Sequence, residues 1–238
     1  MAYDSGNRWT ARATMPQVGV DVGLRDYMLR VYNYMAAGLA ITGLVAYLAV
    51  TTGLYQAIYG TAIYWIVVFA PLALVLLLSF RIQSMSLGAA QLTFWAYAGL
   101  VGLSLAGLFL VYTGASIAQT FFITAATFLA MSLYGYTTRT DLTKFGSFLI
   151  MGLIGIIIAS LANLFFHSAG LQFAISVIGV IVFVGLTAWD TQRIKEMYWE
   201  GDSTAVAGKK AVMGALALYL DFINLFVILM QFMGQRRD

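Results

Sequence analysis

The chain has 238 residues, of which 61% are apolar and only 10% are charged, and its mean hydropathy is +0.86. A water-soluble domain carries about 25% charged residues to solvate its surface, so this composition excludes a soluble globular protein. The absence of cysteine excludes disulfides and cysteine-based metal sites, and the net charge of +3 lies in loops and tails, where it needs no nucleic-acid partner.

The lipid bilayer is therefore the expected partner of most of the surface. In lipid, only helices and closed barrels satisfy every polar group of the backbone. Barrel strands would alternate apolar and polar residues, whereas this sequence contains long unbroken apolar runs. The predicted fold class is all-α, a bundle of membrane-spanning helices.

The chain opens with a polar segment, which predicts an N-terminal tail over 1–30 without a cleavable signal. Seven apolar stretches follow, each near the roughly 20 residues that cross a bilayer, and they predict a membrane domain over 31–233. A short C-terminal tail over 234–238 completes the chain. The expected spans are 31–51, 61–80, 88–112, 117–136, 146–166, 171–190 and 211–233.

The distribution of basic residues predicts the orientation. Seven crossings place all but two of the 13 lysines and arginines on the side of the N-terminus, and the exceptions are Arg236 and Arg237. Cytoplasmic segments of membrane proteins are enriched in lysine and arginine. We therefore expect a multi-pass protein with a cytoplasmic N-terminus and a C-terminus on the opposite side.

Ionisable residues inside the membrane are the first candidates for function, because burying a charge there is costly. Asp221 lies about ten residues into the seventh predicted span, and Asp190 ends the sixth. Arg81 ends the second span on the same side of the membrane. Helical spacing places Asn224 beside Asp221 and Thr187 beside Asp190, so these two polar side chains are candidates to line a pore.

Asp190 and Asp221 come from consecutive helices, which are usually neighbours, so the two carboxyl groups are expected to meet. Two carboxylates in a site of low dielectric constant cannot both ionise cheaply, and they are expected to share one proton. Its loss creates a repulsion that is relieved by helix movement or by a cation such as Arg81 or Ca²⁺, which prefers oxygen ligands. The pair is therefore a candidate pH-sensitive gate and a candidate contact for Ca²⁺.

Four strings resemble the Bax inhibitor-1 family, most closely its bacterial inner-membrane members. They are FFITAATFLAMSLYGYTTRTDLT (121–143), KFGSFLIMGLIGIIIASLANLF (144–165), GLTAWDTQRIK (185–195) and ALYLDFINLFVILMQ (217–231). The resemblance is dense from about Phe80 to Gln231 and weaker in the first helix and the tail.

The resemblance implies a seven-helix bundle with the last helix at its centre, surrounded by the other six, and a pH-sensitive Ca²⁺ leak. In the family, an aspartate in the AxDT motif of the sixth helix pairs with one in the LDFxN motif of the seventh, and Asp190 and Asp221 match these positions. An arginine on the second helix can latch onto the sixth-helix aspartate, and Arg81 in SFR matches it. One departure is Trp189, where the family usually has tyrosine.

A second function stays open beside the channel. Some bacterial relatives are held to bind and restrain a membrane-anchored ATP-dependent quality-control protease without transporting ions. That role would depend on the tail over 1–30 and on the loops, not on the carboxylates. Both functions are expected in the bacterial inner (plasma) membrane.

No enzymatic activity and no resident cofactor are expected, with Ca²⁺ as a transported ion only. Intramembrane aspartyl proteases also place two aspartates on adjacent helices, but they carry a GxGD string that the contexts AWDT and YLDF lack. A retinal protein needs a lysine on its last helix for the Schiff base. The predicted span 211–233 contains none, because Lys209 and Lys210 are assigned to the preceding loop.

Overall fold

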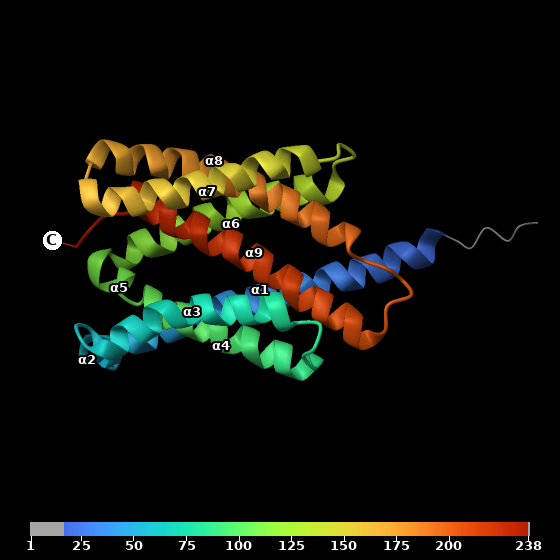
Figure 1. The fold of residues 1–238 in the computed structure, drawn as a ribbon, viewed down its shortest axis with the longest axis horizontal. Helices are drawn as coiled ribbons and strands as arrows, with labels where there is room; N and C mark the ends of the chain where they lie inside the picture. Colours follow the sequence, from blue (N-terminus) through green and yellow to red (C-terminus); the bar gives the residue numbers. More distant parts are fainter. Residues whose placement is uncertain (1–16, 238) are drawn as a thin grey trace, which may run out of the picture.

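The computed structural model describes residues 17–237, and within that range the chain forms nine helices joined by short connections (Figure 1). Their bounds are α1 Gln17–Thr51, α2 Leu54–Ile58, α3 Ala62–Arg81, α4 Leu87–Leu105, α5 Leu108–Val111, α6 Gly114–Thr137, α7 Thr143–Phe166, α8 Ala169–Glu196 and α9 Thr204–Met233. The described range contains no β-strand, so the predicted all-α fold class is confirmed.

Seven helical segments of the described range are long and apolar enough to cross a membrane, which is the predicted number. The short helix α5 continues α4 within a single segment. The segments are Val22–Thr51, Ala62–Arg81, Leu87–Val111, Gly114–Thr137, Thr143–Phe166, Ala169–Glu196 and Thr204–Met233. Because the number of crossings is odd, the start of α1 and the C-terminus lie at opposite ends of the bundle (Figure 1).

The first helix begins well before its predicted start at residue 31. Residues 17–30 of the segment predicted as a tail are helical, whereas residues 1–16 lie outside the described residues. Tyr27, Met28 and Val31 recur at helical spacing and are all buried in the main core, where the Tyr27 ring packs against Tyr198. Packing against protein therefore extends α1 beyond its most apolar part.

The connection between the last two helices is also shorter than predicted. The sequence predicts a loop over 191–210, but α8 continues to Glu196 and α9 begins after Ser203. Lys209 and Lys210 consequently lie in the first turns of α9, so the expectation that the last helix lacks lysine is wrong. Lys209 Nζ donates to Gln83 O at 3.0 Å, and Lys210 Nζ donates to Met197 O at 3.0 Å.

Hydroxyl side chains begin four of the long helices. Each accepts a hydrogen bond from the backbone N–H three residues later, which satisfies one of the free donors at a helix N-terminus. These N-cap residues are Ser86, Thr113, Ser168 and Ser203. The caps explain why α4, α6, α8 and α9 begin where they do.

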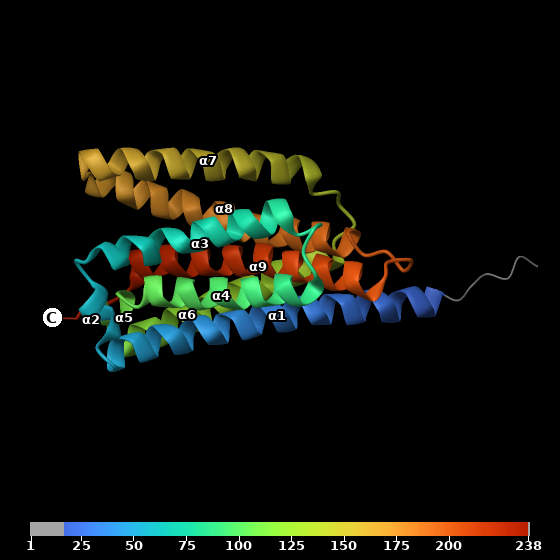
Figure 2. The same cartoon turned by 60° about the horizontal axis from the view of Figure 1, so that its bottom comes forward.

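The last helix, α9, is the centre of the bundle, as the family resemblance implies (Figures 1 and 2). Its most apolar window is 61% buried, against 11% for α7. It packs against α1, α4, α6 and α8, whereas α3 packs mainly on α4, and α7 on α8. The helix is therefore enclosed by four neighbours, not directly by all six others.

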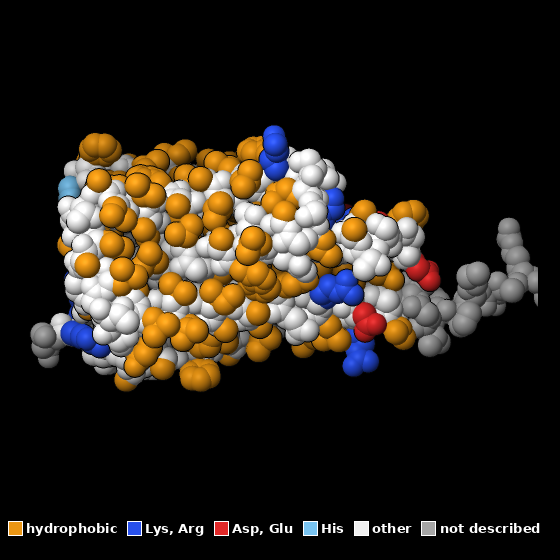
Figure 3. Space-filling model, turned by 90° about the horizontal axis from the view of Figure 1, so that it is seen from below, with side chains coloured by type: hydrophobic (Ala, Val, Ile, Leu, Met, Phe, Trp, Pro, Cys, Tyr) orange, Lys and Arg blue, Asp and Glu red, His pale blue; other side chains and the backbone are white. Residues whose placement is uncertain are grey.

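On the face shown in Figure 3, charged side chains lie towards the ends of the molecule, and the surface between them is apolar or uncharged. Large apolar side chains of the spanning helices are exposed, among them Phe122 on α6 and Phe165 on α7. Such an apolar surface is unfavourable in water and is suited to the hydrocarbon region that spanning helices cross.

The C-terminal residues are fastened to the bundle beyond the end of α9. Gln235 N donates to Ser116 Oγ at 2.9 Å, and Gln235 O accepts from Thr113 N at 3.0 Å. Arg237 N donates to Val111 O at 2.9 Å. The predicted tail over 234–238 thus holds the α5–α6 connection through its backbone.

Candidate carboxylate site between α8 and α9

Asp221 lies in the interior of the bundle, in the middle of the central helix. Its residue is only 4% exposed, and its neighbours Leu218, Phe222 and Leu225 on α9 are also buried. Among the described residues, Asp221 Oδ2 has no hydrogen-bond partner. A buried carboxyl oxygen without a partner is rare and costly, and it marks this position as a site rather than as part of the packing.

Asp190 faces Asp221 from the last third of α8. The two carboxyl groups lie within hydrogen-bonding reach of each other. An ionised carboxylate can only accept a hydrogen bond, so a bond between two carboxyl groups needs one shared proton. The structure thus brings together the two aspartates that the sequence predicts as a pair, and their role in gating stays a prediction.

The cation beside the pair is Arg193, not the predicted Arg81. Arg193 Nη1 lies 3.9 Å from Asp190 Oδ1, one helical turn away, and the guanidinium also lies over the Trp189 ring. The Arg193 side chain is 62% exposed and that of Asp190 14%, so this is a weak, partly solvated ion pair. Arg81 is exposed at the end of α3, and the salt bridges between described residues do not include it.

The two predicted pore-lining residues lie on the same helices, about one turn from the carboxyl groups. Thr187 is fully buried, and its hydroxyl donates to Phe183 O at 2.8 Å. Asn224 is half-buried, and its Nδ2 donates to Leu220 O at 2.8 Å, a bond that does not use the amide oxygen. Both side chains therefore offer oxygen atoms near the pair, although they bond to their own helices in this arrangement.

Close packing fixes α8 against α6 beside the site. A Cβ atom at Gly135 would lie 2.1 Å from Ala188 O, so only glycine permits this approach of the two backbones. Across the same contact, Tyr32 OH bonds to Ser132 Oγ at 2.6 Å and Ser132 Oγ bonds to Thr191 Oγ1 at 2.9 Å.

The direction of this hydroxyl chain follows from its last link. Thr191 Oγ1 donates its single proton to Thr187 O at 2.7 Å, so Ser132 must donate to Thr191, and Tyr32 to Ser132. The sequence did not predict this series of hydroxyl hydrogen bonds, which links α1, α6 and α8. Hydroxyl residues inside apolar spans are the signal for such contacts, but the signal does not specify which residues pair.

Gln192 anchors the connection between α6 and α7 two residues after Asp190. Its Oε1 accepts from Leu142 N at 2.8 Å, and its Nε2 donates to Thr140 O at 2.9 Å. The side chain is buried and both ends of its amide are satisfied. The loop at this end of the bundle is therefore held to the same turn of α8 that carries the site.

The acidic ligands of the site are limited to the pair itself. Among residues 17–237, no group of three or more histidine, aspartate or glutamate side chains is placed to hold a metal ion. Two carboxyl groups with nearby backbone and amide oxygens are hard ligands suited to Ca²⁺ or Mg²⁺ rather than to Zn²⁺. Such a set is sparse compared with a tight Ca²⁺ site, which uses six to eight oxygens.

Comparison with known proteins shows that most of the chain matches one family. The profile of the family described as "Inhibitor of apoptosis-promoting Bax1" matches residues 24–238. The Rickettsia prowazekii protein RP147 is 52% identical, with 96% of this chain and 98% of that protein covered. The inner membrane protein YbhL of Escherichia coli is 48% identical, with 90% and 94% covered. A protein of Caulobacter vibrioides is 45% identical, with 98% of each chain covered.

Proposed function

The chain belongs to the Bax inhibitor-1 family of membrane proteins, and on that premise we propose that it is a pH-sensitive Ca²⁺ leak channel gated by Asp190 and Asp221. One observation carries the proposal: two carboxyl groups from the last two membrane helices lie within hydrogen-bonding reach, and that of Asp221 is buried. Structural packing alone does not require such a pair, because apolar side chains fill the same space at lower cost.

A single shared proton keeps the gate closed in this mechanism. With the proton present, the carboxyl groups bond to each other and hold α8 against α9. When the proton leaves, two negative charges remain in contact in a region of low dielectric constant, where their repulsion is strong. The repulsion between the two carboxylates decreases when the helices move apart, when Arg193 or Arg81 approaches Asp190, or when a cation enters between the carboxylates.

In this mechanism Ca²⁺ is the ion that the protein transports, and it is bound at the site only transiently. The carboxylates attract a divalent cation, and the oxygens of Asn224 and Thr187 lie about one turn away along the same helices. A conducting site must bind the ion strongly enough to admit it and weakly enough to release it. Two carboxylates without a third acidic neighbour in the described range are consistent with that balance.

We expect Asp221→Asn to abolish the pH dependence of Ca²⁺ flux. Asparagine has nearly the same shape, and it donates a hydrogen bond to Asp190 without titrating. The measurement is Ca²⁺ entry into liposomes that contain the purified protein, at steps between about pH 6 and 8. The matched control is Asp141→Asn, in the exposed α6–α7 connection, where asparagine can accept the same bond from Thr143 N. If Asp221→Asn leaves both the flux and its pH profile unchanged, the gating mechanism is wrong.

The proposed orientation places the N-terminus in the cytoplasm. It is supported by the basic residues that gather at the end of the bundle where α1 begins. Because the chain has no native cysteine, Thr52→Cys and Ser84→Cys each introduce a single thiol, at exposed positions on opposite ends. In intact cells, an impermeant thiol reagent should label the first variant and spare the second. The reverse pattern would establish the opposite orientation.

A further inference from the structure

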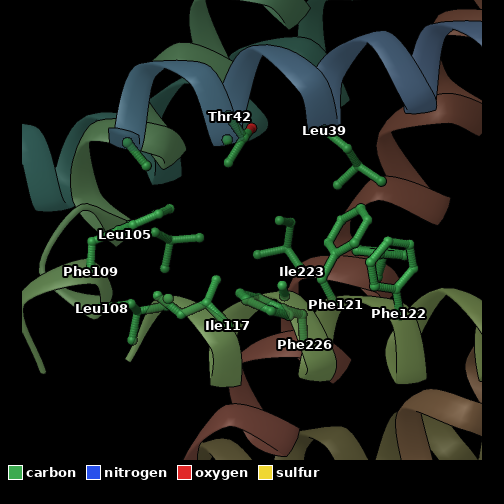
Figure 4. Close-up of a pocket in the computed structure, with 15 residues that line it drawn as sticks. Leu39, Thr42, Leu105, Leu108, Phe109, Ile117, Phe121, Phe122, Ile223 and Phe226 are labelled. Carbon is green, nitrogen blue, oxygen red and sulfur yellow. The ribbon is translucent and has the colours of Figure 1, made fainter. Parts of the chain in front are cut away.

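Helices α1 and α6 both pack on α9 but do not pack closely on each other. Two hollows separate them. One is a cavity of about 320 Å³ near α5, where almost every lining side chain is apolar (Figure 4). The other is a groove of about 330 Å³ closer to the N-terminal end. Both helices are membrane spans, so this groove lies along the lipid-facing side of the protein.

The walls of the groove match a hydrocarbon chain. Leu29 on α1 and Leu129 and Leu133 on α6 line it, and all three are large, exposed apolar side chains. Two of its three hydroxyl groups, those of Tyr32 and Ser132, already bond to each other, and the third belongs to Tyr136. Because Tyr32 donates to Ser132 and Ser132 to Thr191, both protons are used, and these groups need no polar partner from an occupant.

The end of the groove nearest the chain's N-terminus is positively charged. Arg25 lines it from α1, close to the start of the membrane span at Val22. Lys195 of α8 does not itself line the groove but contacts the lining residue Tyr136, because its Nζ donates to Tyr136 O at 2.8 Å and lies 5.5 Å from the centre of the Tyr136 ring. One bond leaves two of the three ammonium donors of Lys195 free for a ligand, and the guanidinium of Arg25 offers five.

We propose that this groove binds one anionic glycerophospholipid from the leaflet on the N-terminal side. The phosphate would lie at Arg25 and Lys195, and one acyl chain would follow Leu29, Leu129 and Leu133. A groove that is cationic at the membrane surface and apolar below it complements a molecule with an anionic head and an apolar tail. A soluble anion would use only the charged end and would leave the apolar walls uncovered.

The test is retention of defined lipids by the purified full-length protein, measured by native mass spectrometry. Phosphatidylglycerol should bind more tightly than phosphatidylcholine of the same chain length. Arg25→Gln should weaken phosphatidylglycerol binding roughly fivefold, as expected for one basic residue at a membrane surface. The matched control is Arg30→Gln, an exposed arginine of the same helix that does not line the groove. Equal weakening by both variants would overturn the proposal in favour of diffuse surface charge.

A second pair of variants tests the apolar part of the groove without a change in charge. Leu133→Trp should fill the groove and lower phosphatidylglycerol retention, whereas Leu164→Trp, at a similarly exposed leucine of α7, should not. Glycerol 3-phosphate at millimolar concentration serves as a headgroup competitor. Retention that is insensitive to Leu133→Trp but abolished by the competitor would show a simple phosphate site and would refute a lipid site.

Discussion

Gly102→Ala is expected to lower the free energy of unfolding by about 2 to 3 kcal/mol, as overpacking of a tight helix contact does. A Cβ atom at this position of α4 would lie 2.5 Å from Thr42 O and 3.0 Å from Thr42 Cα. These atoms belong to the backbone of α1, so a side-chain rotation cannot relieve the clash. The two helices must move apart along their whole contact.

A separation of α1 and α4 would also break a small network of buried hydrogen bonds around Thr42. Thr42 Oγ1 donates to Ala98 O on α4 and to Gly38 O on α1, each at 2.9 Å. Since its only proton is used there, the buried Tyr219 hydroxyl of α9 must donate to Thr42, at 2.6 Å. Three membrane helices therefore meet at one threonine, and a shift of α4 leaves buried polar groups unpaired.

The measurement is thermal unfolding of the purified protein in detergent, and the control lies on the same helix. A Cβ atom at Gly99 meets nothing within 4 Å, so Gly99→Ala changes the helix propensity without a clash. We expect Gly99→Ala to melt at or above the wild-type temperature and Gly102→Ala well below it. Equal melting temperatures for both variants would show that the α1–α4 contact adjusts freely.

Much of the architecture could be predicted because lipid imposes strict rules on sequence. A spanning helix needs about 20 apolar residues, so the number of crossings follows from composition alone. Small residues at a spacing of four, such as Ala98, Gly102 and Ala106 in the third span, are typical of close helix contacts in membranes, and all three are buried. Gly155 and Ala159 on α7 have the same spacing, but a Cβ atom at Gly155 meets nothing within 4 Å. Spacing shows that contact is allowed, not that a partner helix is present.

The two aspartates of the candidate site could be predicted from the sequence, but the residues that surround them could not. An aspartate inside an apolar helix stands out because its burial is costly, whichever helix it faces. The choice between Arg81 and Arg193 depends on how helices rotate, and position in the sequence does not specify rotation. The Ser132–Thr191 bond joins residues 59 positions apart, and no local pattern connects them. Lys209 and Lys210 were wrongly assigned to a loop because α9 extends beyond its apolar part. The N-cap Ser203, not the apolar pattern, marks where this helix begins.

Stability and gating should oppose each other at Asp221. Its Oδ2 atom is buried without a hydrogen-bond partner in the described part of the chain, and the ionisable group that faces it is another acid, Asp190. A buried polar group without a partner costs about 1 to 3 kcal/mol relative to a satisfied one. A residue kept for packing alone would not carry that cost, whereas a gate needs a pair whose closed state is easily disturbed.

We therefore expect Asp221→Asn to raise the free energy of unfolding by about 1 to 3 kcal/mol, because the amide donates to Asp190 and the buried position 221 can no longer ionise. Asp190→Asn should stabilise less, since Asp190 is partly solvated and already lies near Arg193. The two effects should not add in the double variant, because either substitution alone removes the acid pair. Thermal unfolding of all four proteins at one pH measures this cycle. If Asp221→Asn instead melts below the wild type, the shared-proton bond holds the closed bundle more strongly than the amide does, and the acid pair carries no net cost in the closed state.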